Sequence, residues 1–197
     1  MTSLNNPEDA ASNRLLALMR DKDQKRLRRH LEPVVLDYKR PLYNANEPIE
    51  FVHFIESGVG TLMLAMANGR AAEVGTIGNE GFVGLPVVLG DDRAPASVYV
   101  QVPGVGLRMK AETFRKELGR SGPMRATMLQ YAHAFFNQVA QSAACASLHL
   151  LEQRCCRSLL MTRERMHSDE FPLTQEFLAM MLGVRRAGVT VAAGGLQ

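Results

Sequence analysis

The stretch from residue 126 to residue 151 limits the fold more than any other, because it contains no Lys, Arg, Asp or Glu. Its several glutamines, asparagine and serines make it too polar to cross a bilayer. Its apolar residues recur at steps of four and three, the heptad pattern of a helix that packs along its whole length. The pattern therefore predicts a long helix from about Met124 to His149 that other parts of the structure must cover.

Two apolar stripes run along this predicted helix. The first is a heptad seam, which we predict to form a dimer interface: Met128, Ala132, Phe135, Val139, Ser142 and Ala146. The second has a spacing of seven residues and consists of Leu129, Phe136, Ala143 and Leu150. One stripe can cover the chain's own β-domain while the other meets a partner helix. Because so wide an uncharged face is hard to cover within one chain, we predict a homodimer.

The C-terminal segment predicts two short helices separated by a tight turn. Thr174 is a natural N-cap of the first helix, and Gly183 ends it because glycine readily adopts the left-handed conformation. Small Ala179 and apolar Val189 lie where the two helices would cross, at the spacing of a DNA-binding helix-turn-helix. The sequence thus predicts a DNA-binding module, with a plain helical hairpin as the alternative.

The segment between Pro33 and Met109 has a different sequence pattern, in which short runs of β-prone residues alternate with turn-forming residues. Asn68-Gly69 is a strong hairpin signal between two apolar runs. Such spacing predicts an antiparallel sandwich or barrel. Further helices are expected over residues 111–118 and from Leu151 to about Met166.

Residues 13–31 carry helical periodicity and predict one amphipathic helix before the β-rich segment. Its basic cluster is interpreted as the solvent-facing side rather than as a nucleic-acid patch, and consists of Lys25, Arg26, Arg28 and Arg29. The net charge of the chain is only +3, so charge alone does not identify a nucleic-acid binder. Asn5, Glu8 and Asp9 lie among the polar first residues, so no signal peptide is expected, and no apolar run is long enough for a membrane span.

The cysteines and histidines give no pattern of a metal or cofactor site. Cys145, Cys155 and Cys156 are expected to be reduced cytosolic thiols. His53 is interpreted as a core or edge histidine in a predicted strand, with a haem or small-molecule ligand left as the alternative. The histidines lack metal-ligand spacing, so neither a metal nor another cofactor is predicted.

The order of these parts resembles the cyclic-AMP receptor protein/fumarate-nitrate regulator (Crp/Fnr) family of bacterial transcription factors. The matching stretches are IEFVHFIESGVGTLML, the glycine-punctuated VGTIGNEGFVGLPVVLG, VGLRMKAETFRKEL and LTQEFLAMMLGVRR. The resemblance implies an α+β fold: an antiparallel β-roll of the cyclic-nucleotide-binding type (13–122), a dimerisation helix (123–150) and a helix-turn-helix (151–197). It also implies a homodimer on palindromic DNA in the cytoplasm, with RNA polymerase and an unidentified small-molecule effector as further partners and no membrane association.

The glycine-rich loop departs from the pattern of the nucleotide-binding members. Where they carry a glutamate that holds the ribose, this sequence has Leu85, followed by Pro86. Where they carry Arg-Ser against the cyclic phosphate, it has Pro95 and Ala96. A buried phosphate without a cation is unfavourable, so ordinary cyclic-AMP binding is not expected. Arg93, two residues away, is the one candidate to compensate.

The recognition helix departs from the family pattern too. The family arginine that reads guanine or phosphate corresponds to Arg186, but the following glutamate is replaced by Ala187, and a later arginine by Val191. The predicted DNA contacts are Thr174, Gln175, Arg185, Arg186 and Thr190. Gln197 ends the sequence before the family's two-stranded wing, so either the sequence is a fragment or the DNA module is incomplete.

Three functions follow from these observations, in order of preference. The first is a dimeric transcription regulator whose β-roll senses a signal and whose paired helix-turn-helix units bind a palindromic operator. The second is a ligand-sensing or scaffold dimer that has lost DNA binding. The third, an enzyme on a cupin-like roll, ranks last because the sequence lacks paired carboxylates in the glycine loop and a histidine metal cluster; no enzyme activity is expected.

Overall fold

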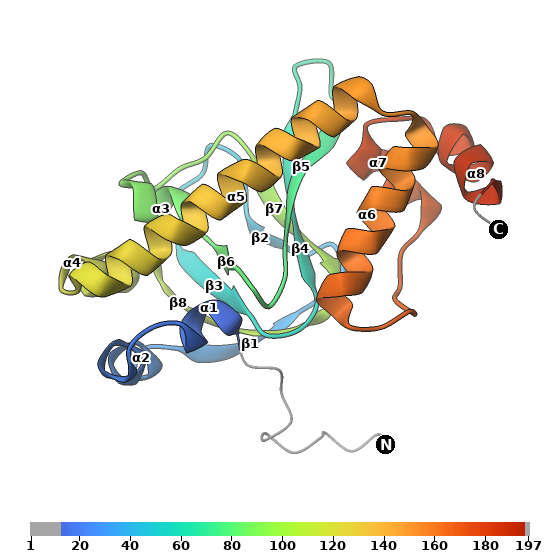
Figure 1. Ribbon diagram of the computed structural model, residues 1–197. Helices are drawn as coiled ribbons and strands as arrows, with labels where there is room; N and C mark the ends of the chain where they lie inside the picture. Colours follow the sequence, from blue (N-terminus) through green and yellow to red (C-terminus); the bar gives the residue numbers. More distant parts are fainter. Residues whose placement is uncertain (1–12, 196–197) are drawn as a thin grey trace.

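The computed structural model describes residues 13–195 (Figure 1). The absence of a signal peptide therefore stays a prediction, since Asn5, Glu8 and Asp9 lie outside the described residues. Short helices α1 (Arg14–Ala17) and α2 (Asp21–Arg28) lead into a β-roll, and helices α4 (Ala111–Gly119) and α5 (Gly122–Leu148) leave it. The chain then continues through α6 (Leu151–Met166), α7 (Gln175–Leu182) and α8 (Arg186–Gly194).

The β-roll consists of two four-stranded antiparallel sheets, as the turn spacing predicts. One has the order β1-β8-β3-β6, with bounds Glu32–Leu36, Gly104–Lys110, Phe51–Ile55 and Phe82–Val83. The other has the order β2-β7-β4-β5, with bounds Pro41–Tyr43, Ser97–Val102, Val59–Ala65 and Ala71–Ile77. The Asn68-Gly69 hairpin is confirmed: Gly69 has a positive φ, and the Met66 amide donates to the Arg70 carbonyl at 2.7 Å. Strands β2 and β6 are too short to show an alternating pattern in the sequence.

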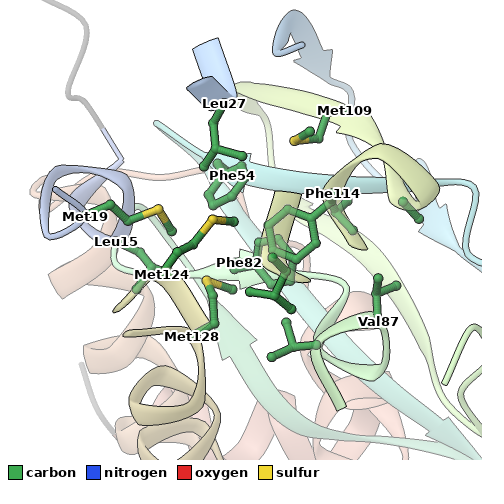
Figure 2. Packing of buried hydrophobic residues seen from close by; sticks show 14 of the residues in the cluster. Leu15, Met19, Leu27, Phe54, Phe82, Val87, Met109, Phe114, Met124 and Met128 are labelled. Carbon is green, nitrogen blue, oxygen red and sulfur yellow. The ribbon is translucent and has the colours of Figure 1, made fainter. Parts of the chain in front are cut away.

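The main core lies where the β-roll meets α1, α2, α4 and the first half of α5. Figure 2 shows Phe54, Phe82 and Phe114 grouped at its centre, with Met124 and Met128 of α5 pointing into the same cluster. The rings of Phe82 and Phe114 are 4.9 Å apart between centroids. This packing fixes the start of α5 on the roll, and Ser121 caps the helix by accepting a hydrogen bond from the Met124 amide at 3.3 Å.

The single amphipathic helix expected over residues 13–31 is wrong: the chain breaks into α1 and α2. Leu18 at the break is 74% exposed, and the side-chain amide of Gln24 donates a hydrogen bond to the Met19 carbonyl there at 2.8 Å. Arg26 also departs from the expected solvent-facing side. Its guanidinium joins the buried carboxylates Asp23, at 3.1 Å, and Glu117 of α4, at 2.6 Å, so it ties α2 to α4.

Helix α5 crosses one face of the roll diagonally (Figure 1), and the side that faces the roll carries Met128 and Phe135 of the predicted dimer seam. Met128 is completely buried in the core and Phe135 is buried against the roll, so neither side chain is available to a partner. The opposite side is exposed, with Leu129 43% and Phe136 67% accessible. Heptad spacing identifies both stripes as apolar but does not tell which one the roll covers, because the residue types are alike.

Within residues 13–195, no single helix is both long and apolar enough to cross a membrane. Only α7 and α8 taken together reach that length and composition, and they bend by 108° at the turn between them.

Candidate functional site

The two C-terminal helices have the geometry of a helix-turn-helix. The side chain of Thr174 accepts a hydrogen bond from the Phe177 amide at 3.1 Å and so caps α7, as predicted. Gly183 ends α7 in the left-handed conformation at φ 66°, and the helices bend by 108°. Ala179 and Val189 are both buried at the crossing, where Val189 is fully inaccessible.

The predicted DNA-contact residues all lie on the outside of this unit. Thr174, Gln175, Arg185, Arg186 and Thr190 are exposed. Arg185 is the N-cap of α8 and Arg186 its first residue, so both guanidinium groups stand at the start of that helix. The hydroxyl of Thr190 donates to the Gln175 side chain at 2.9 Å, which joins the outer faces of α7 and α8. The structure therefore brings Gln175 and Thr190 together, whereas the Thr174 hydroxyl lies 3.4 Å from the hydroxyl of Tyr38.

The helix-turn-helix and α6 are docked on the chain's own β-roll. Phe177 and Met181 of α7 are buried against Met63 of β4, and the ring of Tyr38 lies 5.6 Å from that of Phe177. Helix α6 is held by two polar contacts. The Gln101 side chain donates to Thr162 at 2.8 Å in a buried position, and Arg165 pairs with Glu80 at 2.8 Å. The roll therefore contacts both α6 and the helix-turn-helix directly.

The glycine-punctuated loop is the surface on which α5 and α6 rest. A Cβ atom added at Gly75 would lie 2.8 Å from the Phe135 ring of α5, and one at Gly78 would lie 2.7 Å from the Arg165 side chain of α6. At Gly81 the added atom would meet the Tyr131 hydroxyl at 2.6 Å. The glycines thus permit close helix packing, a role that the sequence pattern alone did not reveal.

A cavity of about 340 Å³, open to the surface, lies in the roll beneath α5. Its wall includes Leu85, Pro95 and Ala96, the positions at which the family resemblance implies nucleotide contacts, together with Pro86. Phe135 and Val139 of α5 close it on one side. Arg93 does not line it: the guanidinium donates to the Asn46 carbonyl at 2.7 Å on an exposed surface. Within residues 13–195, no Lys, Arg, Asp, Glu or His side chain lines this cavity.

Glu73 of β5 is a carboxyl whose pKa is raised by folding. It accepts a hydrogen bond from the Thr61 hydroxyl at 2.7 Å and faces Arg165 and Arg157 of α6. Burial raises the pKa of Glu73 to about 7, and the hydrogen bond from Thr61 and the charges of the two arginines only partly oppose it. Near neutral pH, Glu73 therefore exchanges a proton at the junction of the roll with α6.

We expect this proton to make stability depend on pH. The folded-state pKa is raised above the unfolded value, so the stabilising contribution is complete below about pH 4.5 and is lost as the pH rises through about 7. Glu73→Gln should therefore raise the melting temperature at pH 8 by several degrees, because the neutral amide avoids burying a charged carboxylate, while changing it little at pH 5. At this chain length, about 1 kcal/mol of stability corresponds to about 2–4 °C in melting temperature. Glu164→Gln, at an exposed position, is the control, and equal pH profiles of wild type and Glu73→Gln would contradict the assignment.

The other titratable candidates are packing residues. His53 is buried, and its pKa is lowered to about 4 by desolvation and by the charges of Arg108 and Arg40, so the ring is neutral. Cys145, Cys155 and Cys156 are free thiols. Over residues 13–195, no group of three or more His, Cys, Asp or Glu side chains is arranged to hold a metal ion.

Comparison with known proteins agrees with this architecture. The family model described as "Cyclic nucleotide-binding domain" matches residues 34–121. A search of curated proteins finds no match. Among solved structures, a Crp/Fnr-family protein from Eubacterium rectale superposes with a TM-score of 0.75 at 16% identity, covering 93% of this chain and 86% of that one.

Two further solved structures cover similar shares. The c-di-GMP-responsive global regulator CLP from Xanthomonas campestris has a TM-score of 0.71 at 14% identity, covering 90% of this chain and 92% of that one. FixK2 from Bradyrhizobium japonicum has a TM-score of 0.72 at 14% identity, covering 84% of each chain. Residues 34–121 are therefore a cyclic nucleotide-binding-type domain, and the chain as a whole has the fold of the Crp/Fnr transcriptional regulators.

Proposed function

We propose that this protein is a homodimeric transcription regulator that binds palindromic DNA through α8 and senses a small molecule in its β-roll. The observation that carries the proposal is the pair Arg185 and Arg186, exposed at the N-terminal end of α8, where a recognition helix meets base edges and phosphates. Arginine is suited to both partners because its planar fork binds guanine and phosphate in a bidentate manner.

The exposed side of α5 supports the dimer. Its outward residues follow a heptad seam that we call the α5 seam: Leu129, His133, Phe136, Ala140, Ala143 and Ser147. Phe136 supplies a large apolar side chain, and the small residues after it permit a second α5 to approach closely. We propose this seam, in place of the stripe that contains Met128, as the contact between two copies.

The contacts of α5 and α6 with the roll support a relay. Phe135 rests on Gly75, and Arg165 pairs with Glu80 beside Gly78, so a change inside the roll displaces both helices. In a dimer joined through the α5 seam, such a displacement changes the spacing of the two α8 helices. Binding then requires half-sites about one DNA turn apart, so the sensed molecule controls affinity by setting that spacing.

Selection of bound sequences from a random duplex library tests the proposal. We expect the full chain to enrich inverted repeats whose half-sites are centred about 10 bp apart. The matched control is the double variant Arg185→Ala/Arg186→Ala, which should enrich no motif. If wild type and this variant return the same unselected pool, the protein is better described as the ligand-sensing dimer without DNA binding.

A further inference from the structure

We infer that the cavity inside the β-roll binds an uncharged, apolar small molecule and is unsuited to a cyclic nucleotide. The inference rests on the proposed regulator function for its biological meaning, because it names the class of effector. The binding itself is a property of the cavity and can be measured without DNA.

The side chains that line the cavity are almost all apolar. Leu62 and Leu64 of β4, Val74 and Ile77 of β5 and the core residue Phe82 contribute to it. Val74 is the extra residue of a β-bulge, since Leu62 pairs with Gly75 and the next residue, Met63, pairs with Glu73. Tyr43 brings the one ionisable side chain of this wall, and burial raises its pKa to about 12, so it stays neutral. A molecule in this space therefore meets neither a counter-ion nor a charged acceptor.

The segments that would hold a phosphate and a ribose are also poor in donors. Pro86 and Pro95 have no backbone N–H, and Leu85 and Ala96 have no polar side-chain atom. Arg93, the nearest candidate cation in sequence, is bound to the Asn46 carbonyl outside the cavity. An ionised phosphate placed here would lose its hydration without a charged partner, which is strongly unfavourable.

The size and the position of the cavity fit a small effector. About 340 Å³ is at the lower end of the range for small-molecule sites, enough for a medium-chain alcohol or an aromatic compound of two or three rings. Leu89 at the end of α3 (Leu85–Leu89) lines it and is 67% exposed, so the wall reaches the surface there. Because Phe135 and Val139 belong to α5, a bound molecule touches the proposed relay helix directly.

Fluorescence titration of the full chain with N-phenyl-1-naphthylamine, an uncharged apolar probe, tests the inference. We expect saturable binding at one site per protomer with a micromolar Kd, and displacement of the probe by 1-decanol. Cyclic AMP at millimolar concentration should displace none of it. Absence of saturable probe binding, or micromolar binding of cyclic AMP by calorimetry, would overturn the inference.

Two variants of cavity residues, Val139→Glu and Ala96→Phe, locate the site, with Leu148→Glu as their control. Val139→Glu places a carboxylate in the wall and should weaken probe binding at least tenfold, whereas Leu148→Glu, on the same helix but outside the cavity, should leave it within about twofold. Ala96→Phe fills the space without adding charge, so it preserves the test if Val139→Glu fails to fold. Unchanged affinity in a folded cavity variant would contradict the assignment. Since these titrations contain no DNA, their outcome is separate from that of the library selection.

Discussion

Phe136→Glu is expected to convert the protein from a dimer to a monomer. Phe136 is 67% exposed in the single chain and lies in the middle of the α5 seam. In a twofold dimer, each substitution removes a large apolar contact and buries a carboxylate near its own symmetry mate. An interface residue of this kind contributes at least about 2 kcal/mol, and it occurs twice, so the dimer dissociation constant should rise at least about 700-fold.

Sedimentation velocity at micromolar concentration measures this change. The control is Leu18→Glu, since Leu18 is equally exposed but lies between α1 and α2, away from the seam. We expect Leu18→Glu to sediment as wild type and Phe136→Glu to sediment as a monomer with an unchanged circular dichroism spectrum. A monomeric wild type, or a dimeric Phe136→Glu, would contradict the role of the α5 seam.

Arg186→Ala is expected to lower operator affinity about 10- to 100-fold while leaving the fold intact. The side chain is exposed at the first position of α8, and no side-chain hydrogen bond or ion pair holds it within the described residues 13–195. Its loss therefore removes an intermolecular contact without exposing a buried partner. A bidentate arginine contact to guanine is worth about 1–3 kcal/mol, which corresponds to this range of affinity.

The pattern of the loss distinguishes base reading from general attraction. If Arg186 reads a base, the variant should lose affinity for the selected operator and also discriminate less at one base pair. If it contacts only phosphate, all sequences should weaken alike, and the salt slope should fall by about one. Arg29→Ala, at an exposed arginine of the N-terminal segment, should change neither quantity. Operator affinity equal to wild type in Arg186→Ala would refute the assignment of α8 as the recognition helix.

The sequence predicts much of the fold because each long element carries its own local signal. The Thr174 cap, the left-handed Gly183 and the buried Ala179 and Val189 each follow from residue chemistry, and the structure agrees at every one of them. The Asn68-Gly69 hairpin and the boundaries of α5 are equally local features.

The features that could not be predicted from the sequence depend on contacts between distant segments. The choice between the two stripes of α5 requires knowing that Met128 reaches Phe82 in the roll. The inward turn of Arg26 depends on Glu117, which lies on another helix. The role of Gly75 and Gly78 as platforms for α5 and α6 likewise becomes visible only once those helices are in place. Residues 85, 86, 95 and 96 predicted from the sequence only that ordinary cyclic-AMP binding is lost, and the apolar cavity became visible in the structure.

The most direct measurement is fluorescence anisotropy of a labelled duplex bearing an inverted repeat, titrated with the full chain at several salt concentrations. The account predicts two protomers per duplex, weaker binding to a scrambled duplex of the same composition, and an affinity that falls linearly with salt on logarithmic axes. Equal affinity for both duplexes, or an affinity independent of salt, would contradict a regulator that reads DNA through α8.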